Sequence, residues 1–121
     1  MILVTGGAGY VGSHFLSTYR SLLPSAPVVV VDDTSEGHEK SLPGGSDVHF
    51  HKANIGNQQA MIEIFNRYPI DCVVHFAASA YVGESQIDPF KYFQNNVINS
   101  INLFNAMQSA SVKTRQRIPL K

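Results

Sequence analysis

The sequence lacks the features that define several classes of protein. Its 121 residues include one cysteine, Cys72, and no tryptophan. One cysteine cannot form an internal disulfide, and the sequence contains neither a CxxC pair nor a Cys/His cluster with metal-ligand spacing. We therefore expect no disulfide framework, no metal site and a reducing location, the cytoplasm. Cys72 is interpreted as a small core residue.

Long hydrophobic runs are also missing. No apolar segment approaches the roughly 18 residues that a membrane span requires. Met1 leads into a short apolar segment rather than into the basic start of a secretory leader. We expect no membrane partner.

Neither sign of charge is in excess, because nine Lys and Arg balance nine Asp and Glu. The bases are unevenly placed, however. Residues 1–112 hold all nine acids and five of the nine bases, and residues 113–121 hold the other four bases. A nucleic-acid-binding protein needs a basic face, and the body of this chain is mildly acidic. We expect no nucleic-acid partner and interpret residues 113–121 as a solvated basic tail.

Apolar strand patterns alternate with helical patterns along the chain. Strands are predicted at residues 2–5, 28–31, 48–53 and 72–78. Helices are predicted from Tyr10, around residues 61–68, and after Asp88 and Pro89, which supply an N-cap and a first-turn proline. The inward stripe expected for the last helix is Phe90, Phe93, Val97, Ile101 and Phe104. This alternation predicts an α/β fold, a doubly wound parallel sheet with strand order 3-2-1-4.

The first strand-to-helix turn carries glycines at intervals of three, Gly6, Gly9 and Gly12. In a dinucleotide-binding turn such glycines allow, in order, the sharp bend, the approach of phosphate to bare backbone, and close packing of helix on strand. The pyrophosphate would lie at the helix N-terminus, where the N–H groups of Tyr10 and Val11 have no intrahelical partner. The triplet alone does not exclude an ordinary glycine-rich turn.

An acidic residue at the expected distance supports the dinucleotide interpretation. Asp32 ends the second predicted strand, about 20 residues beyond Gly12, and Asp33 follows it. A carboxylate here accepts hydrogen bonds from the adenosine ribose and repels a 2′-phosphate. The next base along the chain is Lys40, so no arginine follows the strand to bind that phosphate. The expected cofactor is therefore NAD rather than NADP.

Further segments resemble the extended short-chain dehydrogenase/reductases, and among them the UDP-glucose 4-epimerase family. The resemblance covers about residues 1–112. It implies an NAD-binding Rossmann domain that is truncated before its fifth strand, and it leaves residues 113–121 outside the family pattern. The segments that carry it are ILVTGGAGYVGSH at 2–14, VDD at 31–33, VVHFAA at 73–78, YVGES at 81–85, PFKYF at 89–93 and NNV at 95–97.

The resemblance also implies which residues hold the cofactor. Asp32 and Asp33 would bind the adenosine ribose, and Asn95 would lie near the nicotinamide end. Asn54 and Ile55 stand where the family usually has Asp-Ile for the adenine, and the asparagine carbonyl is expected to accept from the adenine amine. Some members have a lysine where this chain has Ala80. The residues expected to line the pyrophosphate and the nicotinamide ribose are Phe76, Ala77 and Ala78.

The activity implied by the resemblance is interconversion of UDP-glucose and UDP-galactose through a 4-keto intermediate, a step of galactose metabolism. That chemistry uses a Tyr-x-x-x-Lys pair and a Ser or Thr. None of the five tyrosines is followed four residues later by lysine. We expect the isolated chain to be inactive, with no catalytic residue of its own, and its sequence to be a truncated or out-of-frame version of an epimerase. A UDP-sugar partner is expected only with a complete C-terminal part.

Other functions remain open from the sequence. One is the nucleotide-binding half of a UDP-arabinose 4-epimerase or of another extended short-chain enzyme such as a sugar-nucleotide dehydratase. Another is a non-catalytic dinucleotide-binding module. The resemblance allows a homodimer through the last predicted helix. His75 is expected to be a hydrogen-bonded core imidazole, while His49 and His51 are interpreted as surface or interlayer histidines because no third metal ligand is identifiable.

Overall fold

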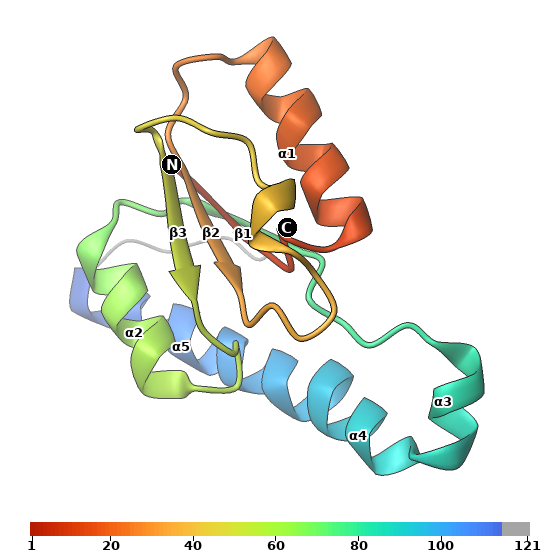
Figure 1. Cartoon of the computed structure of the whole chain (residues 1–121). Coiled ribbons are helices and arrows are strands. Elements are labelled where there is room, and N and C mark those ends of the chain that lie inside the picture. The colour runs from red at the N-terminus through yellow and green to blue at the C-terminus, as the bar shows by residue number, and fades with distance from the viewer. Residues whose placement is uncertain (115–121) are drawn as a thin grey trace.

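The four strands form one parallel sheet in the computed structural model, which describes the backbone of residues 1–114 and the side chains of residues 1–110. The order is β3-β2-β1-β4, and the predicted α/β fold and strand order are confirmed (Figure 1). Residues 115–121, most of the predicted basic tail, lie outside the described residues. The strands are β1 (Ile2–Thr5), β2 (Val28–Asp32), β3 (Val48–Lys52) and β4 (Cys72–His75).

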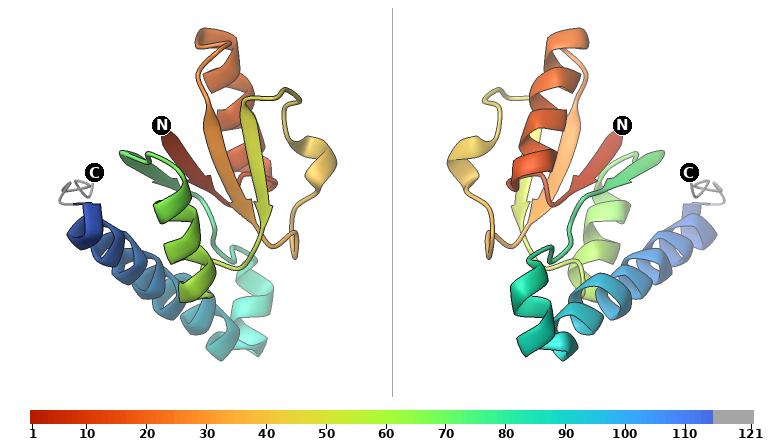
Figure 2. Two further views of the ribbon diagram at one scale, coloured as in Figure 1. Left: turned by 90° about the vertical axis from the view of Figure 1, so that its left-hand side faces the viewer. Right: turned by 90° about the vertical axis from the view of Figure 1, so that its right-hand side faces the viewer.

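Helices cover both faces of the sheet. Helix α1 (Tyr10–Leu22) packs on one face, and helices α2 (Gln58–Arg67) and α5 (Asn99–Thr114) pack on the other (Figure 2). Side chains alternate along β2, so Val28 and Val30 face Leu16 of α1 while Val29 and Val31 pack with α2 and α5. Because both faces are covered, every residue of β2 is buried, which explains its run of valines.

Helix α1 begins at Tyr10, as the sequence predicts, whereas α2 begins at Gln58, before the predicted residues 61–68. The long helix predicted after Asp88 is divided into three consecutive segments. The side chain of Asp88 accepts a hydrogen bond from the Lys91 N–H at the start of helix α4 (Pro89–Phe93). Asn57 caps α2 in the same way, through the N–H of Ala60. A π-helical turn, η2 (Gln94–Ile98), joins α4 to α5. Two short elements were not predicted, the 3-10 helix η1 (Glu39–Ser41) and the helix α3 (Val82–Ile87).

The predicted inward stripe of the last helix is wrong. Helices α3 and α4 extend beyond the sheet (Figure 1), and all five stripe residues are exposed, from Phe90 at 83% to Phe104 at 45%. The opposite face of α5 packs against α2 instead, and Ile101 and Phe104 are left on the exposed side. That buried face consists of Asn99, Leu103, Ala106, Met107 and Ala110.

Strand β4 is only partly covered. Within the described part of the chain it pairs with β1 alone. Val73, Val74 and Phe76 are half-buried, as is the free thiol of Cys72. The other edge of β4 is therefore partly bare among the described residues. No helix in residues 1–114 is both long and apolar enough to cross a membrane.

The half-buried imidazole of His75 bridges β1 and α5. Its Nδ1 lies 2.6 Å from Thr5 Oγ1, and its Nε2 lies 3.0 Å from Ser100 Oγ. The Ser100 hydroxyl donates to the carbonyl oxygen of Asn96, so it accepts from Nε2–H and the Thr5 hydroxyl donates to Nδ1. Burial lowers the pKa of His75. The predicted hydrogen-bonded imidazole is confirmed.

We expect the free energy of unfolding to fall as the pH drops below 6.5, the ordinary pKa of histidine. Below that pH the unfolded chain binds a proton that the folded chain resists until its own, lower pKa is reached. His51, whose pKa is lowered by burial and then by Arg67 and His49, adds to the loss. Urea unfolding at several pH values measures it. The variant His75→Gln should lose less stability on acidification than the wild type. Equal losses in the two proteins would contradict this assignment.

Candidate functional site

One pocket lies at the carboxyl ends of all four strands, beside β1 and β4. This is the topological switch point of the sheet, because β2 and β3 are added on one side of β1 and β4 on the other. In doubly wound sheets this is where ligands bind. Ten of the thirteen residues predicted to bind the cofactor line the pocket: Gly6, Gly9, Asp32, Asp33, Asn54, Ile55, Phe76, Ala77, Ala78 and Asn95. The other lining residues are Val31, Ser35, Glu36, Gly37 and Ala53.

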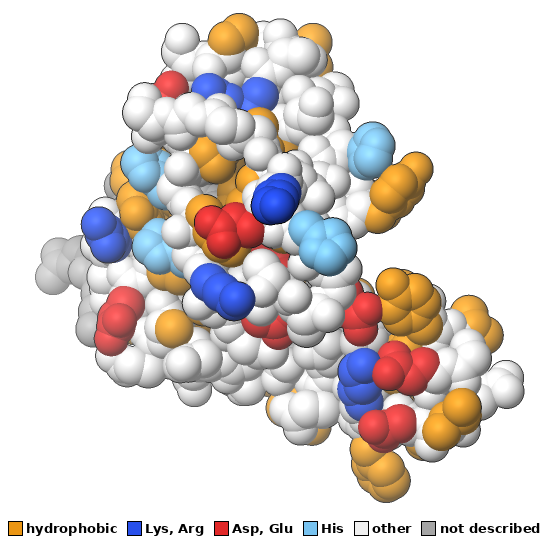
Figure 3. Space-filling view, viewed as in Figure 1, with side chains coloured by type: hydrophobic (Ala, Val, Ile, Leu, Met, Phe, Trp, Pro, Cys, Tyr) orange, Lys and Arg blue, Asp and Glu red, His pale blue; other side chains and the backbone are white. Residues whose placement is uncertain are grey.

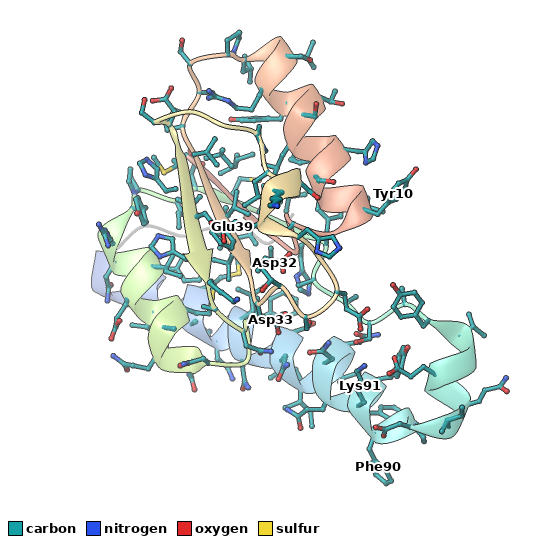
Figure 4. The ribbon with its side chains drawn as sticks, in the orientation of Figure 1. Tyr10, Asp32, Asp33, Glu39, Phe90 and Lys91 are labelled. Carbon is teal, nitrogen blue, oxygen red and sulfur yellow. The ribbon has the colours of Figure 1, made fainter. Side chains whose placement is uncertain are left out.

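The remaining three predicted residues, Tyr10, Val11 and Gly12, do not line the pocket. They form the first turn of α1, directly after Gly9. The side chains of Tyr10 and Val11 are exposed, and Tyr10 points away from the sheet (Figure 4). Their backbone N–H groups belong to a helix start that no side chain caps and that contains no acidic residue. This helix N-terminus suits an anion at the pocket's edge.

The glycine turn is tightly closed. Gly6 adopts a φ of +69°, a conformation that other residues rarely adopt. A Cβ on Gly6 would lie 2.5 Å from the Ala77 nitrogen, and a Cβ on Gly12 would lie 2.2 Å from the Gly6 oxygen. A Cβ on Gly9 would meet nothing closer than the Gly6 oxygen at 3.3 Å. Gly9 is therefore the glycine that leaves its space open to the pocket, as a bound phosphate would need.

Asp32 holds two loops together at the end of β2. Its Oδ2 accepts from the Ala8 N–H at 2.9 Å, and its Oδ1 accepts from the Thr34 N–H at 2.7 Å. The side chain is 7% exposed. Thr34 has a φ of +59°, a strained value for a β-branched residue, and the bond from its N–H to Asp32 stabilises that turn. Each carboxylate oxygen retains one acceptor site.

Asp33 and Asn54 form a carboxylate–amide pair across β2 and β3. Asn54 Nδ2 donates to Asp33 Oδ2 at 2.8 Å, and Ser35 donates to Asp33 Oδ1 through both its N–H and its hydroxyl. Burial raises the pKa of Asp33, but the hydrogen bonds from Ser35 and Asn54 outweigh burial and leave it below its ordinary value. Figure 4 shows Asp32 and Asp33 at the end of β2.

The side-chain carbonyl of Asn54, which the sequence predicts to accept from the adenine amine, already accepts two hydrogen bonds within the protein. Its Oδ1 accepts from the Gly56 N–H at 2.7 Å and from Asn99 Nδ2 at 3.2 Å. Both lone pairs are therefore engaged, and the expected hydrogen bond from the adenine amine has no free acceptor on this side chain. One N–H of the Asn54 amide remains for a ligand.

The opposite side of the pocket is built on the loop after β4. Asn95 Nδ2 donates to Ser79 Oγ at 2.7 Å. The side-chain amide of the next residue, Asn96, makes two hydrogen bonds with the Ser79 backbone. Its Oδ1 accepts from the Ser79 N–H, and its Nδ2 donates to the Ser79 carbonyl. The π-helical turn η2 thus presents consecutive asparagines to one loop. Such turns are frequent at functional sites.

The loop after Asp33 forms part of the pocket wall, through Ser35, Glu36 and Gly37. A Cβ on Gly37 would lie 2.5 Å from the Ala8 carbonyl carbon, so this loop is packed against the glycine turn. Glu36 lies 3.6 Å from Lys91 Nζ on α4, and Lys91 also donates to Glu84 Oε1 at 2.7 Å. Figure 3 shows these charges beside the hydrophobic side chains of the projecting α3–α4 end.

Sequence reasoning missed Asn99 and the loop residues 35–37. The loop has no motif, and its position depends on contacts with Ala8 and Lys91, which are distant in sequence. Asn99 lies on a helix face that the pattern assigned to solvent. The signal available in the sequence was spacing, because Asn99 stands four and seven residues before the apolar Leu103 and Ala106.

The pocket offers hydrogen bonds and a helix N-terminus, but the described residues contain no group of three His, Cys, Asp or Glu that would hold a metal ion. His49 stacks against Tyr68 with ring centroids 5.1 Å apart, and His51 Nε2 lies 3.0 Å from the Tyr68 hydroxyl. Both histidines are thus half-buried against Tyr68.

Comparison with known proteins identifies the family. Residues 2–118 match the NAD dependent epimerase/dehydratase family. The chain is 44% identical over 113 residues to a UDP-glucose 4-epimerase of Halalkalibacterium halodurans and 39% identical over 120 residues to a probable UDP-arabinose 4-epimerase of Oryza sativa. Each match covers 93% of this chain but only 32% and 29% of the relatives. A UDP-glucose 4-epimerase of Klebsiella pneumoniae, 38% identical over 117 residues, is covered to 83%.

Solved structures agree. A UDP-glucose 4-epimerase of Brucella ovis in complex with NAD superimposes with a TM-score of 0.81 at 38% identity, covering 90% of this chain and 32% of that one. One from Stenotrophomonas maltophila, with bound NAD and formylated UDP-arabinopyranose, gives 0.83 at 37% identity, covering 91% and 34%. The chain spans about a third of these structures and carries their Rossmann-like fold. It belongs to the NAD dependent epimerase/dehydratase family.

Proposed function

We propose that the chain is the NAD-binding portion of a UDP-sugar 4-epimerase, one that interconverts UDP-glucose and UDP-galactose through a 4-keto intermediate, and that the isolated chain is inactive. The observation that carries the proposal is the pocket itself. It joins an uncapped helix N-terminus, the open face of Gly9 and the buried carboxylate of Asp32.

The residues present fit a dinucleotide. The pyrophosphate would lie over Gly9 and receive hydrogen bonds from the N–H groups of Tyr10 and Val11. The free acceptor sites of Asp32 and Asp33 would bind the adenosine ribose, while Asn54 and Ile55 would border the adenine. When bound, NAD supplies a hydride acceptor. The residues proposed to line its pyrophosphate and nicotinamide ribose are Phe76, Ala77, Ala78 and Asn95.

The proposed inactivity follows from the absence of a suitable base among the described tyrosines. A phenol acting at neutral pH needs a neighbouring cation to lower its pKa. Tyr92 has an anionic partner instead, since its hydroxyl donates to Glu84 Oε2 at 2.9 Å. Desolvation, followed by Glu84, raises the pKa of Tyr92. Tyr10 is 81% exposed, and its side chain does not line the pocket.

We expect calorimetric titration to show that the chain binds NAD but not UDP-glucose. The pocket holds the groups a dinucleotide needs, whereas the resemblance assigns the sugar nucleotide to a C-terminal part. Adenosine is the matched control ligand, because it carries the adenine and ribose without the pyrophosphate and should bind at least about tenfold more weakly than NAD. Undetectable NAD binding by folded chain would overturn the proposal.

Related assignments rest on the same pocket. The similarity to a probable UDP-arabinose 4-epimerase supports that enzyme as an alternative, and the family's range supports a dehydratase. A non-catalytic dinucleotide-binding module would bind NAD without any sugar-nucleotide partner. A homodimer would form on the exposed stripe of Phe90, Phe93, Val97, Ile101 and Phe104. The single free thiol fits the proposed cytoplasmic location.

A further inference from the structure

We propose that Asn99 is a positioning residue of the dinucleotide pocket, which orients the amide groups of Asn54 and Asn95 from behind the pocket wall. The inference rests on the proposed function and extends it to a residue that does not line the pocket. Asn99 is the first residue of α5, directly after the π-helical turn.

The side chain of Asn99 is 6% exposed and fully engaged as a donor. Its Nδ2 donates to Asn95 Oδ1 at 3.0 Å and to Asn54 Oδ1 at 3.2 Å. Its Oδ1 accepts from Gln94 Nε2 at 3.0 Å. A Cβ on Gly56 would lie 2.3 Å from Asn99 Oδ1, so the chain leaves room here for this side chain.

The two hydrogen bonds from Asn99 fix which way both pocket amides face. Each of Asn54 and Asn95 must present its oxygen to Asn99 Nδ2, so each NH₂ group points the other way. Asn54 Nδ2 then donates to Asp33 Oδ2 at 2.8 Å, and Asn95 Nδ2 donates to Ser79 Oγ at 2.7 Å. Asn99 thus contacts the amides of both Asn54, at the end of β3, and Asn95, beside the loop after β4.

The reverse orientation of Asn54 is unfavourable. It would turn the amide oxygen toward the Asp33 carboxylate and the NH₂ group toward the Gly56 N–H, which pairs acceptor with acceptor and donor with donor. Asn99 adds a third hydrogen bond that favours the same orientation. Without it, Asn95 loses the partner of its oxygen, and its NH₂ group is free to leave Ser79.

The test compares Asn99→Ala with Asn105→Ala, which removes an exposed asparagine from the same helix. NAD affinity is measured by calorimetry and folding by circular dichroism. We expect Asn99→Ala to raise the dissociation constant for NAD about tenfold and Asn105→Ala to change it less than about twofold. Asn99→Ser, which keeps one donor, should fall between them and serves if Asn99→Ala does not fold.

A merely structural role is separated by repeating the substitution in the Asn54→Ala/Asn95→Ala background. If Asn99 acts through those two amides, Asn99→Ala has less than about a twofold further effect there; a tenfold effect in both backgrounds would overturn the proposal. NMR of the NAD-free chain gives an independent readout. The side-chain amide signals of Asn54 and Asn95 should shift in Asn99→Ala and not in Asn105→Ala, and unchanged signals would overturn the proposal.

These readouts separate the two claims. A wild-type chain that binds NAD, with Asn99→Ala binding equally well, contradicts only the role of Asn99. A wild-type chain that binds no NAD contradicts the proposed function and, with it, any role of Asn99 in cofactor binding, whatever the amide signals show.

Discussion

Gly12→Ala is expected to lower the free energy of unfolding by about 3 kcal/mol and to abolish NAD binding. The added Cβ would lie 2.2 Å from the Gly6 oxygen and 2.8 Å from the Gly7 Cα. These are backbone atoms, so no side-chain rotation relieves the overlap, and either α1 or the glycine turn must move. Urea unfolding measures the loss of stability, and calorimetry measures the loss of binding.

Gly9→Ala is the matched control, since it adds the same methyl group three residues earlier in the chain. Gly9 has a φ of −75°, which alanine adopts, and its nearest contact would be at 3.3 Å. We expect stability to fall by about 1 kcal/mol or less. The methyl would occupy the pocket, so NAD affinity should fall about 10- to 100-fold. Unchanged NAD affinity in folded Gly9→Ala would contradict the placement of the phosphates.

NAD is expected to bind at least about 100-fold more tightly than NADP. Two unit charges 4 Å apart repel by about 4 kcal/mol at an effective dielectric of 20, and the doubly negative 2′-phosphate would approach the Asp32 carboxylate. That carboxylate is held in place by the N–H groups of Ala8 and Thr34, so it cannot turn away without breaking both bonds. Parallel titrations with NAD and NADP measure the ratio.

Asp32→Asn should reduce that preference to about tenfold or less, because the repelling charge is removed. It should also weaken NAD binding, since the new NH₂ group faces an N–H donor that the carboxylate accepted. Glu39→Gln on η1 is the control, because it removes one negative charge from an exposed position outside the pocket and should leave the ratio unchanged. Tighter binding of NADP than NAD by the wild type would refute the role of Asp32.

The sheet was predictable because its signals are local. Four consecutive valines indicate a strand covered on both faces, and the glycines that follow β1 indicate a tight turn into a helix. Gly6 and Asp32 could be assigned to one site from the glycine motif and its spacing, whereas Asn54 and Phe76 were assigned from the resemblance to a known family. All four lie in one pocket, because parallel strands present their carboxyl ends at the same edge.

The parts that could not be predicted depend on contacts between distant residues. A helical pattern shows that apolar residues share a face, but it does not show which face packs. In α5 the side chains of Ile101 and Phe104 are exposed, and the face with Leu103 and Ala106 is buried against α2. The engagement of the Asn54 carbonyl likewise depends on Asn99, 45 residues away.

The position of the pyrophosphate in a crystal structure of the chain with NAD tests the central claim most directly. We predict that its oxygens contact the N–H groups of Tyr10 and Val11 beside Gly9, with the adenosine ribose on Asp32. A dinucleotide bound elsewhere, with the glycine turn free of phosphate, would contradict the account.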